Sequence, residues 1–252
     1  MRNFEPKRPY QKVGLELRQM LVEKNYKVGD KLPAERDIAE LLGVTRTVVR
    51  EALIMLELEN LIEVRKGSGV FIIDLPSSST HSHPLKDDVG PFELLQARQL
   101  LESNIAEFAA LQATPKDIAQ MREALDMEIS ELNKKEGQQY GDKEFHLCVA
   151  RATQNSVLVD MLLESWERRE NSPMWEQLHS RIRSTVYQER WLQDHSDILL
   201  ALQKKDPVAA KRAMWQHLEN VKFKLFELSD VDDPSFDGYL FKSNPVVLSE
   251  NK

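Results

Sequence analysis

The sequence predicts a mostly α-helical protein in two parts: a small N-terminal part that ends in a short β-hairpin, and an all-α bundle of six to seven helices. Apolar residues recur at helical spacing in nearly every long segment. Only "LIEVRKGSGVFII", residues 61–73, reads as two β-rich runs around a glycine-bearing turn. The stretch "LPSSSTHSHPLKDDVG", residues 75–90, is rich in short side chains and predicts a linker between the two parts.

The N-terminal part contains three predicted helices before the hairpin. The first spans residues 10–24. Pro33 suits a first helical position and Gly43 a helix stop, which predicts a second helix at residues 33–42. Thr45 is the predicted N-cap of a third. The apolar positions of these helices, which we expect to be buried, are Val13, Leu17, Met20, Leu21, Ile38, Leu41, Leu42, Val49, Ala52, Leu53 and Leu56.

From Pro91 on, every long segment has helical periodicity. Thr114-Pro115 and Asp206-Pro207 are N-cap and first-turn proline pairs. The expected helices lie at about 91–112, 115–134, 139–152, 156–169, 173–183, 186–204 and 207–228. We expect a DNA-binding domain at 1–75, a linker at 76–90, a ligand-binding helical domain at 91–228 and a tail at 229–252.

Charge is unevenly distributed between the two parts. Residues 1–75 hold 13 Lys and Arg against 12 Asp and Glu, whereas residues 76–252 hold 21 against 29. The acidic C-terminal part argues against nucleic-acid binding there and leaves the N-terminal part eligible. The single cysteine, Cys148, cannot form an internal disulfide. With no membrane-spanning stretch and no signal-peptide core, the expected location is cytoplasmic, with no membrane partner.

Three helices followed by a hairpin is the order of a winged helix-turn-helix, whose recognition helix enters the major groove. Arg46, Thr47 and Arg50 lie in the first turns of that helix, and we expect them off its buried face, where arginine can bond guanine edges or phosphate. Arg36 is placed to hold the DNA backbone, and Lys66 and Gly67, at the wing tip, to enter the minor groove. The alternative is a solvated basic face, which the order of the elements disfavours.

Asp142 and His146, in "GDKEFHLCVA", are four residues apart on one predicted helix and can bind one cation together. His195 and His217 follow on later helices. Three imidazoles and a carboxylate suit Zn, Ni, Fe or Mn. Spacing links only Asp142 to His146, so ordinary buried polar histidines remain an alternative.

The stretch "LPAERDIAELLGVTRTVVREALIMLE", followed by "GSGVFI", resembles the DNA-binding domain of the GntR family of bacterial regulators. The pieces "PAER", "VTRTVVREAL" and the wing glycines match in order and spacing. The resemblance implies a homodimer that binds a short palindromic operator. It implies DNA contacts from Arg36, Thr45, Arg46, Thr47, Arg50, Lys66 and Gly67.

The helical part resembles the FCD ligand-binding domain of the FadR subfamily of those regulators. That resemblance implies one divalent metal, with ligands Asp142, His146, His195 and His217, and a small organic acid bound beside it. Arg98 and Asn155 hold the matching effector-binding positions. For Arg98, the alternative is a surface salt bridge with Glu102. For each of the four tryptophans, core packing is favoured over a place in the effector pocket.

The stretches "GPFELLQARQLLESNIAEFAALQAT", "AMWQHLENVK" and "FDGYLF" are similar to the hexuronate-utilisation repressors of the UxuR and ExuR type. This similarity implies a repressor released from its operator by a sugar acid. Two other classes stay open: a metal-dependent enzyme, for which no general base is linked to the site by spacing, and a DNA-binding protein with a purely structural metal.

Overall fold

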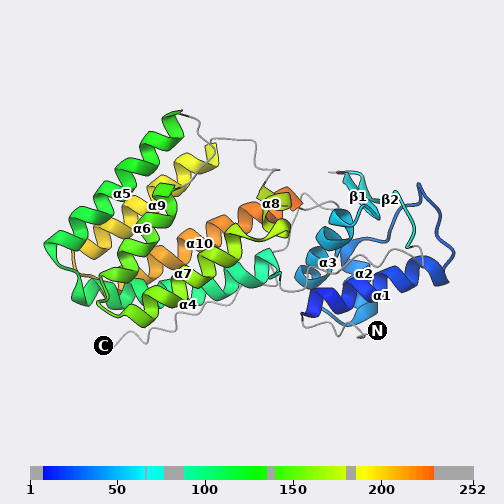
Figure 1. Ribbon diagram of the computed structural model, residues 1–252, viewed down its shortest axis with the longest axis horizontal. Helices are drawn as coiled ribbons and strands as arrows, with labels where there is room; N and C mark the ends of the chain where they lie inside the picture. The colour runs from blue at the N-terminus through cyan, green and yellow to red at the C-terminus, as the bar shows by residue number, and fades with distance from the viewer. Residues whose placement is uncertain (1–7, 66, 77–87, 135–139, 180–185, 230–252) are drawn as a thin grey trace. The chain divides into compact units, whose positions relative to one another are not determined.

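A computed structural model describes residues 8–65, 67–76, 88–134, 140–179 and 186–229. Across these ranges the chain forms ten helices and one two-stranded sheet (Figure 1). It divides into two compact units. The first holds the N-terminal helices, the sheet, α8 (Pro173–His179) and the end of α10 (Pro207–Ser229) from Leu225 onward; the second holds the other helices from Glu93 to Lys224.

The first unit is a three-helix arrangement with a hairpin. Helix α1 (Pro9–Glu23) packs against α3 (Arg46–Leu58), which also contacts α2 (Glu35–Leu42) and α8. Gly43 adopts the left-handed conformation, with φ of 65°, and ends α2. Thr45 caps α3, because its Oγ1 accepts a bond from Val48 N at 3.4 Å. The turn between α2 and α3 is therefore fixed at both ends.

The wing is an antiparallel hairpin of β1 (Ile62–Arg65) and β2 (Gly69–Ile72), with Ile62 opposite Ile72. A third segment extends it: Lys31 bridges to Phe71, and Leu32 N donates to Val70 O at 2.9 Å. Gly67 and Gly69, in and just after the turn, have φ of 73° and 112°. Both angles lie in the region that favours glycine.

The second unit is a bundle of α4 (Pro91–Gln112), α5 (Pro115–Lys134), α6 (Tyr140–Arg151), α7 (Ser156–Glu170), α9 (Val186–Gln203) and α10. Helix α5 packs against α6 and α9, and α6 packs against α7. Gln99 on α4 bonds Trp215 O and Glu219 Oε2 on α10, at 3.1 and 2.7 Å. These contacts bring α6, α9 and α10 around one interior.

The mostly helical fold is confirmed, with a winged helix-turn-helix followed by a helical bundle. Helix α2 begins at Glu35 rather than Pro33. The predicted burial of Leu41 is wrong: it is 61% exposed, because the eight-residue α2 buries only a narrow face that contains Ile38 and Ala39. Most of the predicted linker and tail lies outside the described residues. None of the described helices is long and apolar enough to cross a membrane.

Candidate functional site

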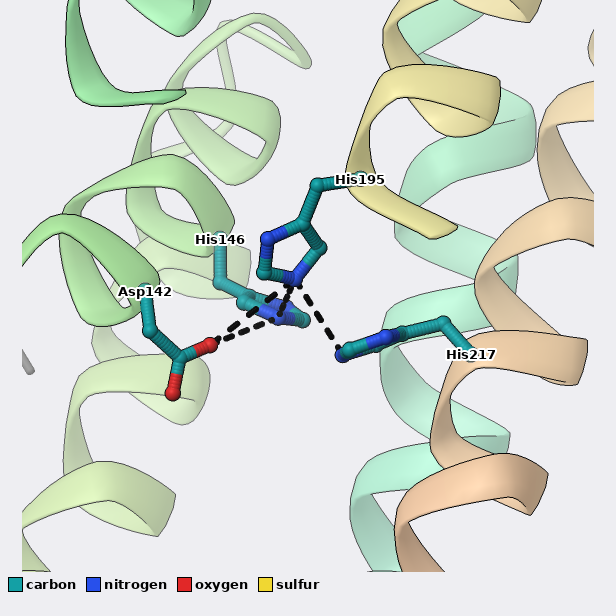
Figure 2. A group of neighbouring side chains, drawn as sticks. All are labelled: Asp142, His146, His195 and His217. Atoms are coloured by element: carbon teal, nitrogen blue, oxygen red, sulfur yellow. Dashed lines mark hydrogen bonds and ion pairs between the residues drawn. The ribbon is translucent and has the colours of Figure 1, made fainter. Parts of the chain in front are cut away.

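Four side chains that could hold a metal ion come from three helices and meet inside the second unit (Figure 2). Asp142 and His146 come from α6, His195 from α9 and His217 from α10. One donor atom from each lies within 4.8 Å of all the others. The structure thus brings together all four residues of the predicted metal site.

The histidines present the same ring nitrogen to a common point. His195 Nε2 lies 3.2 Å from His146 Nε2 and 3.2 Å from His217 Nε2. Asp142 Oδ1 lies 3.5 Å from His146 Nε2 and 3.8 Å from His195 Nε2. All three imidazoles are at most 3% exposed.

The opposite ring nitrogen of each histidine faces a carboxylate. His146 Nδ1 contacts Glu102 Oε2, and His195 Nδ1 lies 2.7 Å from Glu128 Oε2. His217 Nδ1 lies 3.4 Å from Asp194 Oδ2. Such partners favour a proton on Nδ1, which leaves the Nε2 lone pair free for a metal. No spacing pattern in the sequence links these carboxylates to the histidines.

The pKa values of His146 and His217 are shifted in opposite directions. Burial lowers the pKa of His146, but the carboxylates of Glu102 and Asp142 outweigh it and raise that pKa to about 9. Burial, reinforced by the nearby His195, lowers the pKa of His217 to about 3. In the metal-free cluster His146 is therefore protonated near neutral pH, and a metal would replace that proton.

The carboxylates of the site stay ionised although they are buried. Burial raises the pKa of Glu102, but Arg98 and His146 together lower it to about 2. Burial also raises the pKa of Asp142, and His146 and Arg169 hold it well below its usual range. An anionic donor set with converging nitrogen lone pairs attracts a cation.

Two guanidiniums accompany the cluster. Arg98 Nε donates to Glu102 Oε1 at 2.5 Å, and this pair is buried, with side chains 3% and 1% exposed. The alternative of a surface pair is therefore wrong for Arg98. Arg169, on α7, donates to Asp142 Oδ2 at 3.2 Å. Both guanidiniums lie over the ring of Trp166, with their central carbons 4.2 and 4.5 Å from its centroid. No motif in the sequence marks Arg169 as part of the site.

Gly141 sets the distance between α5 and α6 beside the cluster. A Cβ on this glycine would lie 2.4 Å from the backbone nitrogen and 2.6 Å from the Cα of Glu128. The missing side chain therefore lets the start of α6 approach α5 closely. This approach brings Asp142 and Glu128 to the same site.

Asn155 does not reach this cluster. It is exposed and caps α7, where its Oδ1 accepts bonds from Val157 N at 3.1 Å and Leu158 N at 3.4 Å. At 1.5 Å per residue, it lies about 20 Å along the helix from Arg169. The structure thus gives Asn155 a capping role at the start of α7, and its effector contact stays a prediction. The N-cap preference of asparagine before a helix was the sequence signal for its observed role.

The predicted DNA-contacting residues fall into two groups. Arg36 is exposed and pairs with Asp37 at 3.2 Å; Gly67 is exposed at the hairpin turn, and Thr45 is the exposed cap of α3. Arg46 is half-buried in the first turn of α3. Lys66 lies outside the described residues.

The prediction that Thr47 and Arg50 lie off the buried face of α3 is wrong. They are 8% and 2% exposed. Arg50 is enclosed because Glu35, in the first turn of α2, lies opposite it and forms a two-pronged ion pair. The pair joins the first and second helices of the helix-turn-helix.

A winged helix-turn-helix and a helical domain with a buried metal-donor cluster together define the class of ligand-responsive DNA-binding regulators. Comparison with known families supports this class. Residues 9–72 match the family described as bacterial regulatory proteins, gntR family, and residues 93–220 match the FCD domain.

The chain is similar to named regulators over nearly its whole length. It is 57% identical over 244 residues to the Uxu operon transcriptional regulator of Escherichia coli K12, covering 95% of each chain. It is 56% identical over 241 residues to the Uxu operon regulator of Haemophilus influenzae, covering 96% of this chain and 91% of that one. Identity to the Exu regulon transcriptional regulator of Escherichia coli K12 is 47% over 249 residues, covering 96% and 95%.

The chain belongs to the GntR family of bacterial regulators and carries an FCD domain. It is a metabolite-responsive DNA-binding transcriptional regulator and not an enzyme.

Proposed function

We propose that this regulator represses hexuronate-utilisation genes and leaves a palindromic operator when a sugar acid binds beside a metal in the helical domain. The observation that carries the proposal is the buried donor cluster accompanied by two guanidiniums. The names of the relatives, Uxu operon and Exu regulon regulators, support the choice of a hexuronate such as glucuronate, fructuronate or galacturonate.

The donor set fits a divalent transition metal. Asp142, His146, His195 and His217 would hold the ion, and imidazole-rich sites suit Zn, Ni, Fe or Mn better than Ca or Mg. A bound ion would supply positive charge at a buried site. It would thereby offset the cost of burying the carboxylate of an acid.

Arg98 and Arg169 are the proposed anion-binding residues of the chain itself. Each already contacts a buried carboxylate, Glu102 or Asp142, which holds its guanidinium beside the cluster. Guanidiniums bind carboxylates in a planar, two-pronged geometry. An acid held by both would contact helices α4 and α7 at once.

DNA recognition is assigned to the first unit. Arg36, Arg46, Thr47 and Arg50, with Thr45, Gly67 and Lys66, are the proposed contacts. Arg50 would act either through its pair with Glu35 or after exchanging that partner for DNA. One winged helix reads one half-site, so a palindromic operator requires a homodimer.

An operator titration tests the proposal. A palindrome selected from random duplexes is titrated with metal-loaded protein in the presence of hexuronates and aldonates, with and without a chelator. A hexuronate is expected to weaken binding by about 5- to 150-fold, the usual range of allosteric coupling, and the chelator to remove the response. A full response in chelated protein would show that the metal is structural, and no response to any acid would contradict the proposed effector.

A further inference from the structure

The indole of Trp166 carries a buried donor that the described structure leaves unpaired. This side chain, on α7, is 2% exposed, and its Nε1 has no hydrogen-bond partner among the residues that the structure describes. A buried donor without a partner costs about 1–3 kcal/mol. Most buried polar groups in native proteins are bonded to protein, water or ligand. We therefore expect the N–H of Trp166 to donate to a group other than the described residues, such as a bound ligand.

The surroundings of this indole are those of the proposed effector site. The ring centroid of the metal-donor residue His146 lies 5.7 Å from that of Trp166. Arg98 and Arg169 lie over the same indole. Trp166 is thus in contact range of both guanidiniums and one metal donor.

We infer that Trp166 is an effector-binding residue whose Nε1–H donates a hydrogen bond to a hydroxyl or carbonyl oxygen on the carbon chain of a sugar acid. This inference rests on the proposed function, because it places the sugar acid at the same cluster. The indole has a further role: its ring holds the guanidiniums of Arg98 and Arg169, the proposed ligands of the carboxylate.

The chemistry of the indole defines the class of ligand. An indole N–H donates and cannot accept, so its partner must be an acceptor oxygen. The guanidiniums match the carboxylate, which leaves the oxygens of the chain for Trp166. A site built to bond such an oxygen disfavours ligands that lack it, because the donor is then left buried and unpaired. Together, the guanidiniums and the indole N–H select polyhydroxy acids over simple carboxylic acids.

The variant Trp166→Phe separates the N–H from the aromatic ring. Phenylalanine keeps an aromatic face for the guanidiniums but removes the N–H donor together with part of the ring volume. The control is Trp175→Phe, which makes the same change at a tryptophan that is 7% exposed and lies on α8 of the other unit. Calorimetry measures the binding of glucuronate, galacturonate and acetate to zinc-loaded wild type and to both variants.

The expected result is a fall of about tenfold in hexuronate affinity for Trp166→Phe, the size of one lost hydrogen bond. Acetate affinity and zinc affinity stay at wild-type values, thermal stability changes by no more than it does in Trp175→Phe, and Trp175→Phe binds every ligand as the wild type does. Equal hexuronate affinity in Trp166→Phe and wild type overturns the inference and leaves the proposed function standing. Wild-type protein that binds zinc but no hexuronate contradicts the proposed function itself.

A second measurement avoids any dependence on the folding of the variant. Wild-type protein is labelled with 15N at the indole nitrogens. The Trp166 signal is the one that is missing from the spectrum of Trp166→Phe. It can also be assigned as the signal that remains in every variant in which one of the other three tryptophans is replaced. Hexuronate is expected to shift this signal downfield, and acetate to leave it in place. An unmoved signal at saturating hexuronate, or the same shift with acetate, rejects the bond to the sugar chain.

Discussion

Arg50 and Glu35 form a buried, two-pronged ion pair across the helix-turn-helix, with Arg50 Nε 3.0 Å from Glu35 Oε1 and Arg50 Nη2 2.6 Å from Glu35 Oε2. Both side chains are 3% exposed. A residue of the recognition helix is thereby tied to the helix before it. The arginine that the sequence predicts to contact DNA therefore also stabilises the DNA-binding unit.

Arg50→Ala is therefore expected to destabilise the protein as well as to weaken DNA binding. Removal of one partner from a buried pair leaves the other charge uncompensated, which costs about 3–5 kcal/mol. Urea unfolding, followed by circular dichroism, measures the loss. The control is Arg65→Ala, which breaks an exposed pair with Glu63 at 2.7 Å and is expected to change stability by less than about 1 kcal/mol. Equal stabilities of the two variants would contradict the assignment.

Arg46→Ala is expected to separate recognition from stability. Arg46 begins the recognition helix and is half-buried, and loss of a base contact costs about 1–3 kcal/mol of operator affinity. Fluorescence anisotropy with the selected palindrome gives the affinity, and Arg122→Ala, an exposed change on α5, is the control. Lys66→Ala, a prediction from sequence alone, should weaken binding to all duplexes and flatten its salt dependence. An unchanged palindrome affinity in Arg46→Ala would exclude base readout by this residue.

Glu128→Gln is expected to weaken metal binding without touching the metal ligands. The Glu128 carboxylate contacts His195 Nδ1 at 2.7 Å, and loss of such a partner lowers metal affinity by about 10- to 100-fold. Zinc competition with a chromophoric chelator measures it. The control is Glu123→Gln, which makes the same substitution at an exposed residue of the same helix. The role of Glu128 is rejected if both variants hold zinc equally well.

Arg169→Ala is expected to lower hexuronate affinity by about 10- to 100-fold, the contribution of a charge-assisted hydrogen bond. Its neighbour Arg168 provides a matched control, because it pairs with Glu164 at 2.6 Å with both side chains well exposed. Calorimetry on zinc-loaded protein compares Arg169→Ala, Arg168→Ala and Arg98→Ala. Hexuronate binding that survives in metal-free His195→Ala protein would show that the effector does not need the metal.

A homodimer is expected in solution, with or without DNA, since each winged helix supplies one half of a two-fold symmetric reader. Sedimentation velocity at micromolar concentrations tests this directly. A single species with the mass of one 29.1 kDa chain, both free and on DNA, would contradict it.

Helix positions were predictable because they depend on local signals. Pro91, Pro115, Pro173 and Pro207 each begin a helix, and Gly43 and Thr45 frame the turn, as the sequence predicts. Arg50 was misplaced for a physical reason. Helical spacing locates a residue on its own helix, whereas its burial depends on Glu35 from another helix.

The candidate site was only partly visible in the sequence. Asp142 and His146 share one helix and could be linked by spacing, but His195 and His217 required the family resemblance. Glu102, Glu128 and Asp194 look like ordinary helical carboxylates until packing turns each toward a histidine. The positions of Trp166 and Arg169 beside the cluster likewise depend on the packing of neighbouring helices and could not be predicted from spacing.

The four donors come from three different helices, so a bound metal ion would connect distant parts of the chain. With its single cysteine, the protein cannot form a disulfide within one chain. An ion held by His146, His195 and His217 would instead act as a reversible cross-link that closes loops spanning 49 and 22 residues. Cross-links of this kind stabilise a fold by restricting the unfolded chain, and longer loops gain more. Metal supply would then set the resistance of the helical domain to proteolysis and heat, independently of any sugar acid.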